Sequence, residues 1–138
     1  MICGVALVKA LGSLVPAGLA LKWPNDVQWQ GRKLAGVLVE IAGESTGPSY
    51  AVIGVGINVC MPDVAASRID QPWTDLTRCI GKTPSRNAVA AAVLNALVDA
   101  LQRFQTVGLS PFIDTWRHYD ATAGKLKAAV DDYAKTFA

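Results

Sequence analysis

The first 60 residues alternate between apolar runs and short polar breaks, and this pattern predicts one helix followed by several strands. Residues 2–14 are apolar apart from Lys9, as expected for a helix that packs on a sheet. Later runs have the length and the β-branched composition of strands, at residues 19–23, 27–30, 34–41 and 50–59. Turn residues separate these runs at positions 24–26, 31–33 and 43–49. We therefore expect an antiparallel meander backed by the first helix.

The second half of the chain has the period of helices. Apolar side chains recur at intervals of three and four at Val89, Val93, Leu97, Leu101 and Phe104. This spacing predicts one long helix over residues 86–107, with Ser85 as its N-cap and Gly108 as its stop. Shorter helices are expected at residues 73–80 and 111–119. Together the two halves predict an α+β fold in which a mixed, largely antiparallel sheet is backed by helices.

Composition narrows the class of protein. The chain has 138 residues, and its 51% hydrophobic content predicts one globular domain rather than a disordered segment. Thirteen basic and eleven acidic residues give a net charge of +2 without a basic run, so nucleic-acid binding is not expected. Lys9 interrupts the first apolar run well before the roughly 18 residues that a membrane span needs. Cys3, Cys60 and Cys79 are far apart and odd in number, which indicates reduced cytoplasmic thiols.

Glycines and a lysine among the predicted strands suggest a binding site. Gly54 and Gly56 are two residues apart and therefore share one face of a strand, and Gly36 lies inside the preceding strand. Such a face has no side chains, so a flat ligand could lie against the backbone. Lys33 precedes that strand, where its ammonium group could reach a carboxylate or phosphate in the trough.

Each of these features also has a simpler interpretation. A lysine in a Gly-Arg-Lys turn is usually a solvated turn residue. The pair Gly54 and Gly56 lacks the third glycine and the helix start of a dinucleotide-binding fingerprint, so we reject a Rossmann fold. His118, the only histidine, has no Cys or acidic partner at metal-ligand spacing and is expected to lie at a helix end or on the surface.

Three motifs that occur in order along the chain favour a binding site over ordinary turn and strand residues. They are Lys-Trp-Pro-Asn-Asp at 22–26, Arg-Lys-Leu-Ala-Gly-Val-Leu-Val-Glu at 32–40 and Ile-Gly-Val-Gly-Ile-Asn at 53–58. Their combination closely resembles the catalytic domain of bacterial biotin–protein ligases. The resemblance implies a core related to class II aminoacyl-tRNA synthetases. It extends more loosely to about residue 124, so we expect a partial catalytic domain over residues 1–124 and a tail over residues 125–138.

The resemblance implies a two-step, ATP-dependent reaction assisted by Mg²⁺. Biotin is first converted to biotinyl-AMP, and the biotinyl group then passes to a lysine of a biotin carboxyl carrier protein or a similar domain. Localisation in the cytoplasm is expected, and a homodimer is possible. Two alternatives remain open, namely a lipoate–protein ligase and an inactive fragment that only binds or assembles through exposed sheet edges.

The family pattern also implies roles for individual residues. Lys33 is the expected catalytic residue and a contact to biotin. The floor beneath biotin is expected to consist of Gly36, Leu38, Gly54 and Gly56. The nucleotide side is expected to consist of Lys22, Asn25, Asp26 and Asn58, of which Asp26 and Asn58 would also contact magnesium.

The chain also departs from the family pattern at both ends. The family carries an upstream Ser/Thr-rich biotin contact and a glycine-arginine-rich loop that closes over the adenylate, and neither occurs in this sequence. The small C-terminal β-domain of the family is absent as well. We therefore expect the chain to be a catalytic core that is incomplete at both ends.

Overall fold

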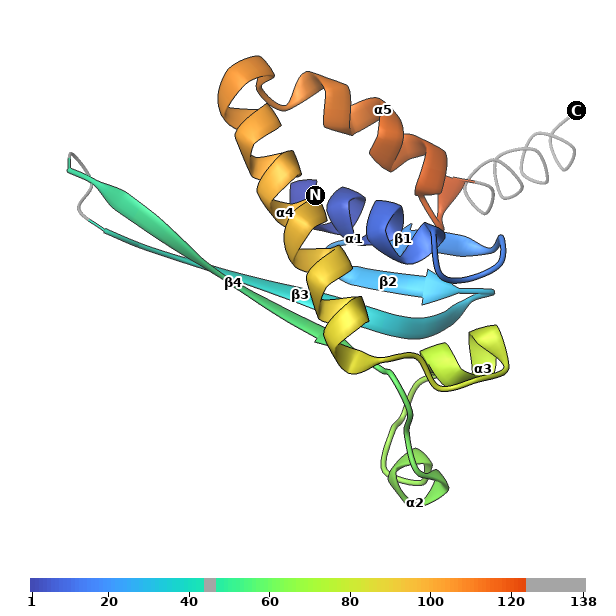
Figure 1. Ribbon diagram of the computed structural model, residues 1–138. Coiled ribbons are helices and arrows are strands. Elements are labelled where there is room, and N and C mark those ends of the chain that lie inside the picture. Colours follow the sequence, from blue (N-terminus) through green and yellow to red (C-terminus); the bar gives the residue numbers. More distant parts are fainter. Residues whose placement is uncertain (44–46, 124–138) are drawn as a thin grey trace, which may run out of the picture.

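A computed structural model describes residues 1–43 and 47–123 (Figure 1). In this part of the chain the strands form one antiparallel sheet in the order β1-β2-β3-β4. The strands are β1 (Leu19–Lys22), β2 (Asp26–Trp29), β3 (Arg32–Gly43) and β4 (Ser49–Ile57). The predicted meander and the α+β class are therefore confirmed. The expected boundary at residue 124 and the tail at residues 125–138 lie outside the described residues.

The helices of the described residues are α1 (Ile2–Gly12), α2 (Asp63–Ala66), α3 (Leu76–Ile80), α4 (Arg86–Val107) and α5 (Ser110–Tyr119). Of these, α1, α4 and α5 lie on one side of the sheet (Figure 1). Helix α1 contacts β1 and β2 from one side and also packs against α4 and α5. Figure 1 shows these three helices together on one side of the sheet, whereas the β3–β4 hairpin reaches beyond them. The other face of the sheet is therefore left uncovered by the helices.

The core lies between α1 and the covered face of the sheet. Leu7 and Leu11 of α1 and Val27 and Leu34 of the sheet have no solvent-exposed surface. Burying one side chain of this size contributes about 1.5–3 kcal/mol to folding. Helix α1 ends at Gly12, two residues before the predicted end. No helix among the described residues is long and apolar enough to cross a membrane.

Caps explain where the later helices begin and end. Helix α4 has the predicted bounds, because Ser85 Oγ accepts a hydrogen bond from the Ala88 amide and Gly108 adopts a φ of 72°. The helix predicted over residues 73–80 begins only at Leu76. Its N-cap is Asp75, whose Oδ1 accepts a hydrogen bond of 2.8 Å from the Arg78 amide.

The prediction of a turn at residues 31–33 is wrong in a way that affects the site. The reversal is a tight one at Gln30 and Gly31, whose φ angles are 49° and 76°. Arg32 and Lys33 already belong to β3. The backbone of Lys33 bonds to residues 72–74 on one side, so this polar residue has strand partners that local sequence does not reveal.

Candidate active site

One row of residues crosses the whole sheet at the centre of the candidate site. Lys22 pairs with Asp26, Asp26 with Gly36, and Gly36 with Gly56. Residues directly opposite each other in antiparallel strands point to the same face. The row therefore places two charged side chains beside two positions without side chains, on the face that the helices leave uncovered. The prediction that the glycines share one face is confirmed.

A β-bulge brings Lys33 onto this same face. Val27 pairs with Ala35, but the next residue of β2, Gln28, pairs with Lys33. Leu34 is therefore the extra residue of β3, and its side chain is buried in the core together with that of Ala35. A bulge of one residue reverses the facing of every side chain beyond it. Lys33 thus points away from the core, toward the face that carries Gly36.

The side chain of Lys33 lies across Gly36 toward Asp26. Its Nζ is 2.8 Å from Asp26 Oδ1, and the two side chains are 32% and 23% exposed. A Cβ atom built on Gly36 would lie 3.5 Å from both Lys33 Cε and Asp26 Oδ1. These are ordinary van der Waals distances, so the lysine chain and the carboxylate both lie directly against the backbone at Gly36. The expectation that glycine marks a close approach at this position is confirmed.

A shallow trough of about 540 Å³ surrounds this ion pair. It is lined by Asn25, Asp26, Lys33, Gly36, Val37, Leu38, Gly54, Val55 and Gly56. A Cβ atom at Gly56 would meet no other heavy atom within 4 Å, so the glycine floor is open to a ligand. The structure thus brings together seven of the nine residues singled out in the sequence, with a cation and a carboxylate at one end and a floor made of three glycines and Leu38 at the other.

The two remaining residues, Lys22 and Asn58, do not line the trough. Lys22 is exposed at the end of β1, and it belongs to the row across the sheet through its pairing with Asp26. Asn58 directs its Nδ2 at protein carbonyls, 3.0 Å from that of Thr74 and 3.4 Å from that of Lys33. Asn58 thus contacts the backbone that carries Lys33, a relationship that the motif alone does not reveal.

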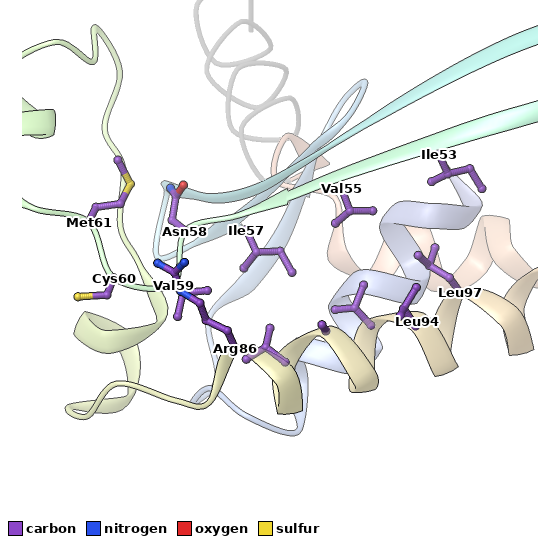
Figure 2. A pocket seen from close by; sticks show the side chains of 13 residues that line it. Ile53, Val55, Ile57, Asn58, Val59, Cys60, Met61, Arg86, Leu94 and Leu97 are labelled. Atoms are coloured by element: carbon purple, nitrogen blue, oxygen red, sulfur yellow. The ribbon is translucent and has the colours of Figure 1, made fainter.

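A larger hollow of about 700 Å³ lies on the opposite side of β4, between this strand and α4 (Figure 2). Its walls are mainly aliphatic and include Ile53, Val55 and Ile57 from β4 and Leu94 and Leu97 from α4. Asn58 and Arg86 line it together with these residues. The walls offer no acid–base pair for chemistry, so the trough remains the candidate active site although it is smaller.

The segment that follows β4 carries a carboxylate that sequence reasoning missed. Asp75 is only 2% exposed, and its Oδ2 accepts hydrogen bonds from the Met61 amide and from Arg78 Nη1. Arg78 also lies over the Trp73 ring, 4.2 Å from its centroid, and pairs with Asp63. The N-cap spacing between Asp75 and Arg78 was the available sequence signal for this cluster.

A bound magnesium ion would find few protein ligands here. No group of three or more His, Cys, Asp or Glu side chains comes together within residues 1–43 and 47–123. Among the residues that the structure describes, Asp26 is the one carboxylate lining the trough, and one of its oxygens already faces Lys33. This donor set is suited to an ion that arrives with phosphate oxygens, because Mg²⁺ commonly takes only one or two carboxylates from the protein.

Comparison with known proteins relates this site to a family. A sequence profile described as the Biotin/lipoate A/B protein ligase family matches residues 4–58, which contain the whole sheet and all nine predicted site residues. This segment of the chain is therefore similar to part of the domain that defines this family.

The relatives narrow the assignment within the family. The Bifunctional ligase/repressor BirA of Escherichia coli (strain K12) is 37% identical over 120 residues, covering 87% of this chain and 37% of that protein. The Biotin--[acetyl-CoA-carboxylase] ligase of Paracoccus denitrificans is 33% identical over 131 residues, covering 90% of this chain and 53% of that protein. The chain is thus a homologue of biotin protein ligases and spans between 37% and 53% of the length of these two.

A solved structure gives the same assignment for the fold. Biotin protein ligase from Aquifex aeolicus, in complex with biotin and ATP, superposes with a TM-score of 0.71 and 28% sequence identity. The match covers 87% of this chain and 49% of that chain. The described residues therefore have the fold of part of a biotin protein ligase catalytic core, as the sequence motifs predicted.

Proposed function

We propose that this chain forms part of the active site of a biotin protein ligase. In the first step an oxygen of the biotin carboxylate attacks the α-phosphorus of ATP, and the bond to the β-phosphate breaks, which gives biotinyl-AMP and pyrophosphate. In the second step the amine of an acceptor lysine attacks the acyl carbon, loses a proton and releases AMP. The observation that carries the proposal is the position of the Lys33 ammonium above the floor formed by Gly36 and Gly56.

Lys33 is the proposed catalytic residue. Bringing a carboxylate to a phosphate sets two anions against each other, and a fixed cation between them lowers that repulsion and stabilises the charged transition state. An ammonium group has three hydrogen-bond donors, and Asp26 takes one of them. An ion pair this exposed is worth at most about 1 kcal/mol. Lys33 can therefore exchange part of its pairing with Asp26 for contacts to the substrates.

The glycine floor is the proposed binding site for the biotin ring. Gly36 and Gly56 are paired across β3 and β4, and the pair formed by Leu38 and Gly54 lies two residues further along the hairpin. Leu38 is 60% exposed and extends the apolar surface of the floor. A flat ring can lie against the floor at Gly54 and Leu38 while its aliphatic chain runs back over Gly36 and Gly56. The carboxylate at the end of that chain would then face Lys33.

Asp26, Asn25 and Lys22 are the proposed residues on the nucleotide side. Asn25 and Asp26 line the charged end of the trough, and the Asn25 carbonyl accepts a hydrogen bond of 2.9 Å from the Val37 amide. This bond ties the loop after β1 to β3. Asp26 is positioned to contact magnesium brought in by ATP, and Lys22 adds positive charge in the same row. The magnesium ion would screen the negative charge of the phosphates, whereas the Lys33 ammonium would stabilise the negative charge of the reacting carboxylate.

The proposal extends to the partners of the reaction. The acceptor would be a lysine on a biotin carboxyl carrier protein or a similar biotin-accepting domain, and the reaction would take place in the cytoplasm, where ATP is available. We also propose that the chain forms a homodimer and that it does not bind nucleic acid. Sedimentation of the purified chain with and without biotin and ATP would test the dimer.

The reaction can be tested by following the adenylate itself. The purified, folded chain is mixed with magnesium and ATP radiolabelled at the α-phosphate, together with biotin or lipoate. The proposal predicts a labelled acyl-adenylate with biotin and much less with lipoate. Formation of the adduct with lipoate instead would favour the lipoate–protein ligase alternative. A folded sample that forms neither adduct would contradict the proposed activity for this chain.

A further inference from the structure

Trp23 is the most exposed of the four tryptophans in the chain. It is 60% exposed, whereas Trp29, Trp73 and Trp116 are half-buried. Tryptophan is on average a well-buried residue type, because its large apolar ring is unfavourable in water. Aromatic side chains that stay exposed on a folded protein are enriched at protein–protein interfaces. The exposed indole therefore indicates a contact with another molecule.

The ring of Trp23 is held in place although it is exposed. It packs edge to face against Trp116 of α5, with ring centroids 6.0 Å apart and an angle of 87° between the planes. Trp116 itself packs against the core. The loop after Trp23 is fixed as well, because the Asn25 carbonyl accepts a hydrogen bond of 2.9 Å from the Val37 amide. The indole is thus a pre-organised surface, which loses little conformational freedom when a partner covers it.

Trp23 lies beside the charged end of the trough but does not line it. Only two residues separate it from Asp26, so the two Cα atoms are at most about 11 Å apart. The contact with Trp116 places the Trp23 ring toward α5, whereas Lys22 and Asp26 belong to the row on the open face of the sheet. Trp23 therefore does not compete with the ligands proposed for the trough.

The second step of the proposed reaction brings a protein to this place. The acyl carbon of biotinyl-AMP would lie near Lys33, and the acceptor lysine has to reach it from solvent. A lysine side chain extends roughly 6 Å from its Cα, so the backbone of the acceptor domain must come close to the trough. Residues 22–25 are all exposed at this rim, whereas on the other side the backbone of Lys33 is bonded to residues 72–74. A domain that enters across residues 22–25 would cover the Trp23 ring.

We propose that Trp23 is the docking contact for the acceptor domain, an inference that rests on the function proposed above. The partner is a folded domain that presents an apolar side chain next to its acceptor lysine, because an exposed indole ring offers an apolar contact area. The lysine enters the trough while the neighbouring apolar side chain lies on Trp23. Docking affects only the transfer step, since biotin and ATP react without the acceptor.

Two variants of Trp23 and one matched control test this contact. Trp23→Ala removes the ring, and Trp23→Phe keeps an aromatic ring at the same position. Tyr50→Ala is the control, because Tyr50 is an aromatic residue of similar exposure, 64%, and lies four residues before Gly54, roughly 13 Å further along β4. Circular dichroism should show that all three variants are folded.

The transfer step is followed with two acceptors. Preformed biotinyl-AMP is mixed with the chain and with either a purified biotin-accepting carrier domain or Nα-acetyl-lysine amide, which has the same amine without a domain. For Trp23→Ala we expect the KM for the carrier domain to rise at least about tenfold, as is typical when a central aromatic contact is removed. The rate with the small amine and the rate of adenylate formation should stay nearly unchanged. Trp23→Phe should restore most of the loss, and Tyr50→Ala should behave like the unchanged chain.

A second readout is independent of ligase activity. Emission from an exposed indole shifts to shorter wavelength when the ring leaves water, so a carrier domain without tryptophan should shift the emission of the folded chain. Trp23→Phe should abolish this shift and keep most of the binding in a calorimetric titration. Trp23→Ala should raise the Kd for the carrier domain at least about tenfold in the same titration.

The outcomes separate this inference from the proposed function. An unchanged KM for the carrier domain in Trp23→Ala would show that the acceptor docks elsewhere and would overturn the inference. An equal loss of adenylate formation and transfer would show that Trp23 acts on the trough or the fold, and the same loss in Tyr50→Ala would remove the specificity; either result also overturns it. If the unchanged chain forms no adenylate, the proposed function fails, and fluorescence and calorimetry alone decide whether the carrier domain docks at Trp23.

Discussion

Lys33 and Asp26 form an ion pair of 2.8 Å that depends on a single extra residue in a strand. Without the bulge at Leu34, the alternation of side chains would direct Lys33 to the helix-covered face and away from Asp26. The bulge buries two consecutive residues of β3, Leu34 and Ala35, and exposes the lysine before them. The bulge at Leu34 thus both fills the core and places the Lys33 ammonium on the open face of the sheet.

Removing the carboxylate of this pair should affect activity more than stability. Asp26→Asn keeps the size of the side chain but loses the charge that faces Lys33. Because the pair is partly exposed, we expect the free energy of unfolding to fall by no more than about 1 kcal/mol. The rate of adenylate formation should fall roughly tenfold, since Lys33 would lose its orientation and the proposed magnesium contact would lose its carboxylate. Urea unfolding and adenylate formation measured on one preparation check both expectations.

Asp114→Asn is the matched control for that variant. Asp114 pairs with Arg117 on the exposed surface of α5, at 3.5 Å. Its neutralisation should leave both the stability and the rate nearly unchanged. If Asp114→Asn lowered the rate as much as Asp26→Asn, the effect would come from net charge and not from the position of Asp26.

Filling the glycine floor should block the ligand and leave the fold intact. The site of a Cβ at Gly56 is open space, so Gly56→Leu can be accommodated without a clash and should leave the unfolding midpoint nearly unchanged. A misplaced methylene group in a pocket costs about 1–3 kcal/mol of binding, and we expect the Kd for biotin to rise at least about tenfold. Gly56→Ala should give a smaller increase. Calorimetric titration with biotin measures both, and unchanged affinity in Gly56→Leu would place biotin elsewhere.

Two carboxylates that share Arg78 should differ sharply in their contribution to stability. Asp75 is buried, caps α3 and accepts from the Met61 amide, whereas the side chain of Asp63 is 94% exposed. Asp75→Ala should lower the free energy of unfolding by about 2–3 kcal/mol, because it removes a cap and leaves buried donors unpaired. Asp63→Ala should change it little, as expected for an exposed ion pair. Similar losses in urea unfolding would show that Asp75 has no special role in this cluster.

The three thiols should differ in reactivity. Burial raises the pKa of the Cys3 and Cys79 thiols above the ordinary value, which lowers the fraction of reactive thiolate at neutral pH, whereas Cys60 is exposed. An aromatic disulfide reagent should therefore react quickly with one thiol of the folded chain and with all three after unfolding. Cys60→Ser should abolish the fast phase, and a fast phase that survives this substitution would contradict the assigned burial.

Some elements could be predicted from the sequence because their determinants are local. Helix α4 has the expected bounds, since Ser85, the apolar spacing and Gly108 all lie within or next to the helix itself. The glycine face was also predictable, because two residues that are two apart in a strand always share a face.

Other features depend on partners that are distant in sequence. Lys33 was assigned to a turn because a local reading of Gly-Arg-Lys does not include residues 72–74, which bond to its backbone. The bulge at Leu34 follows from the register between β2 and β3, and the donors of Asn58 reach carbonyls 25 and 16 residues away. Residue type and spacing were thus sufficient for the floor of the trough but not for the geometry that places the lysine over it.

The most direct test of the catalytic role proposed for Lys33 is the biotin-dependent exchange of labelled pyrophosphate into ATP by the purified chain and by Lys33→Ala. Loss of a well-placed charge of this kind costs about 2.7–4 kcal/mol of barrier, so we expect exchange by the unchanged chain and a decrease of about 100- to 1,000-fold in the variant. Circular dichroism should show that both samples are folded. Exchange that persists in Lys33→Ala, or a folded unchanged chain without exchange, would contradict the assignment of this trough as an adenylating active site.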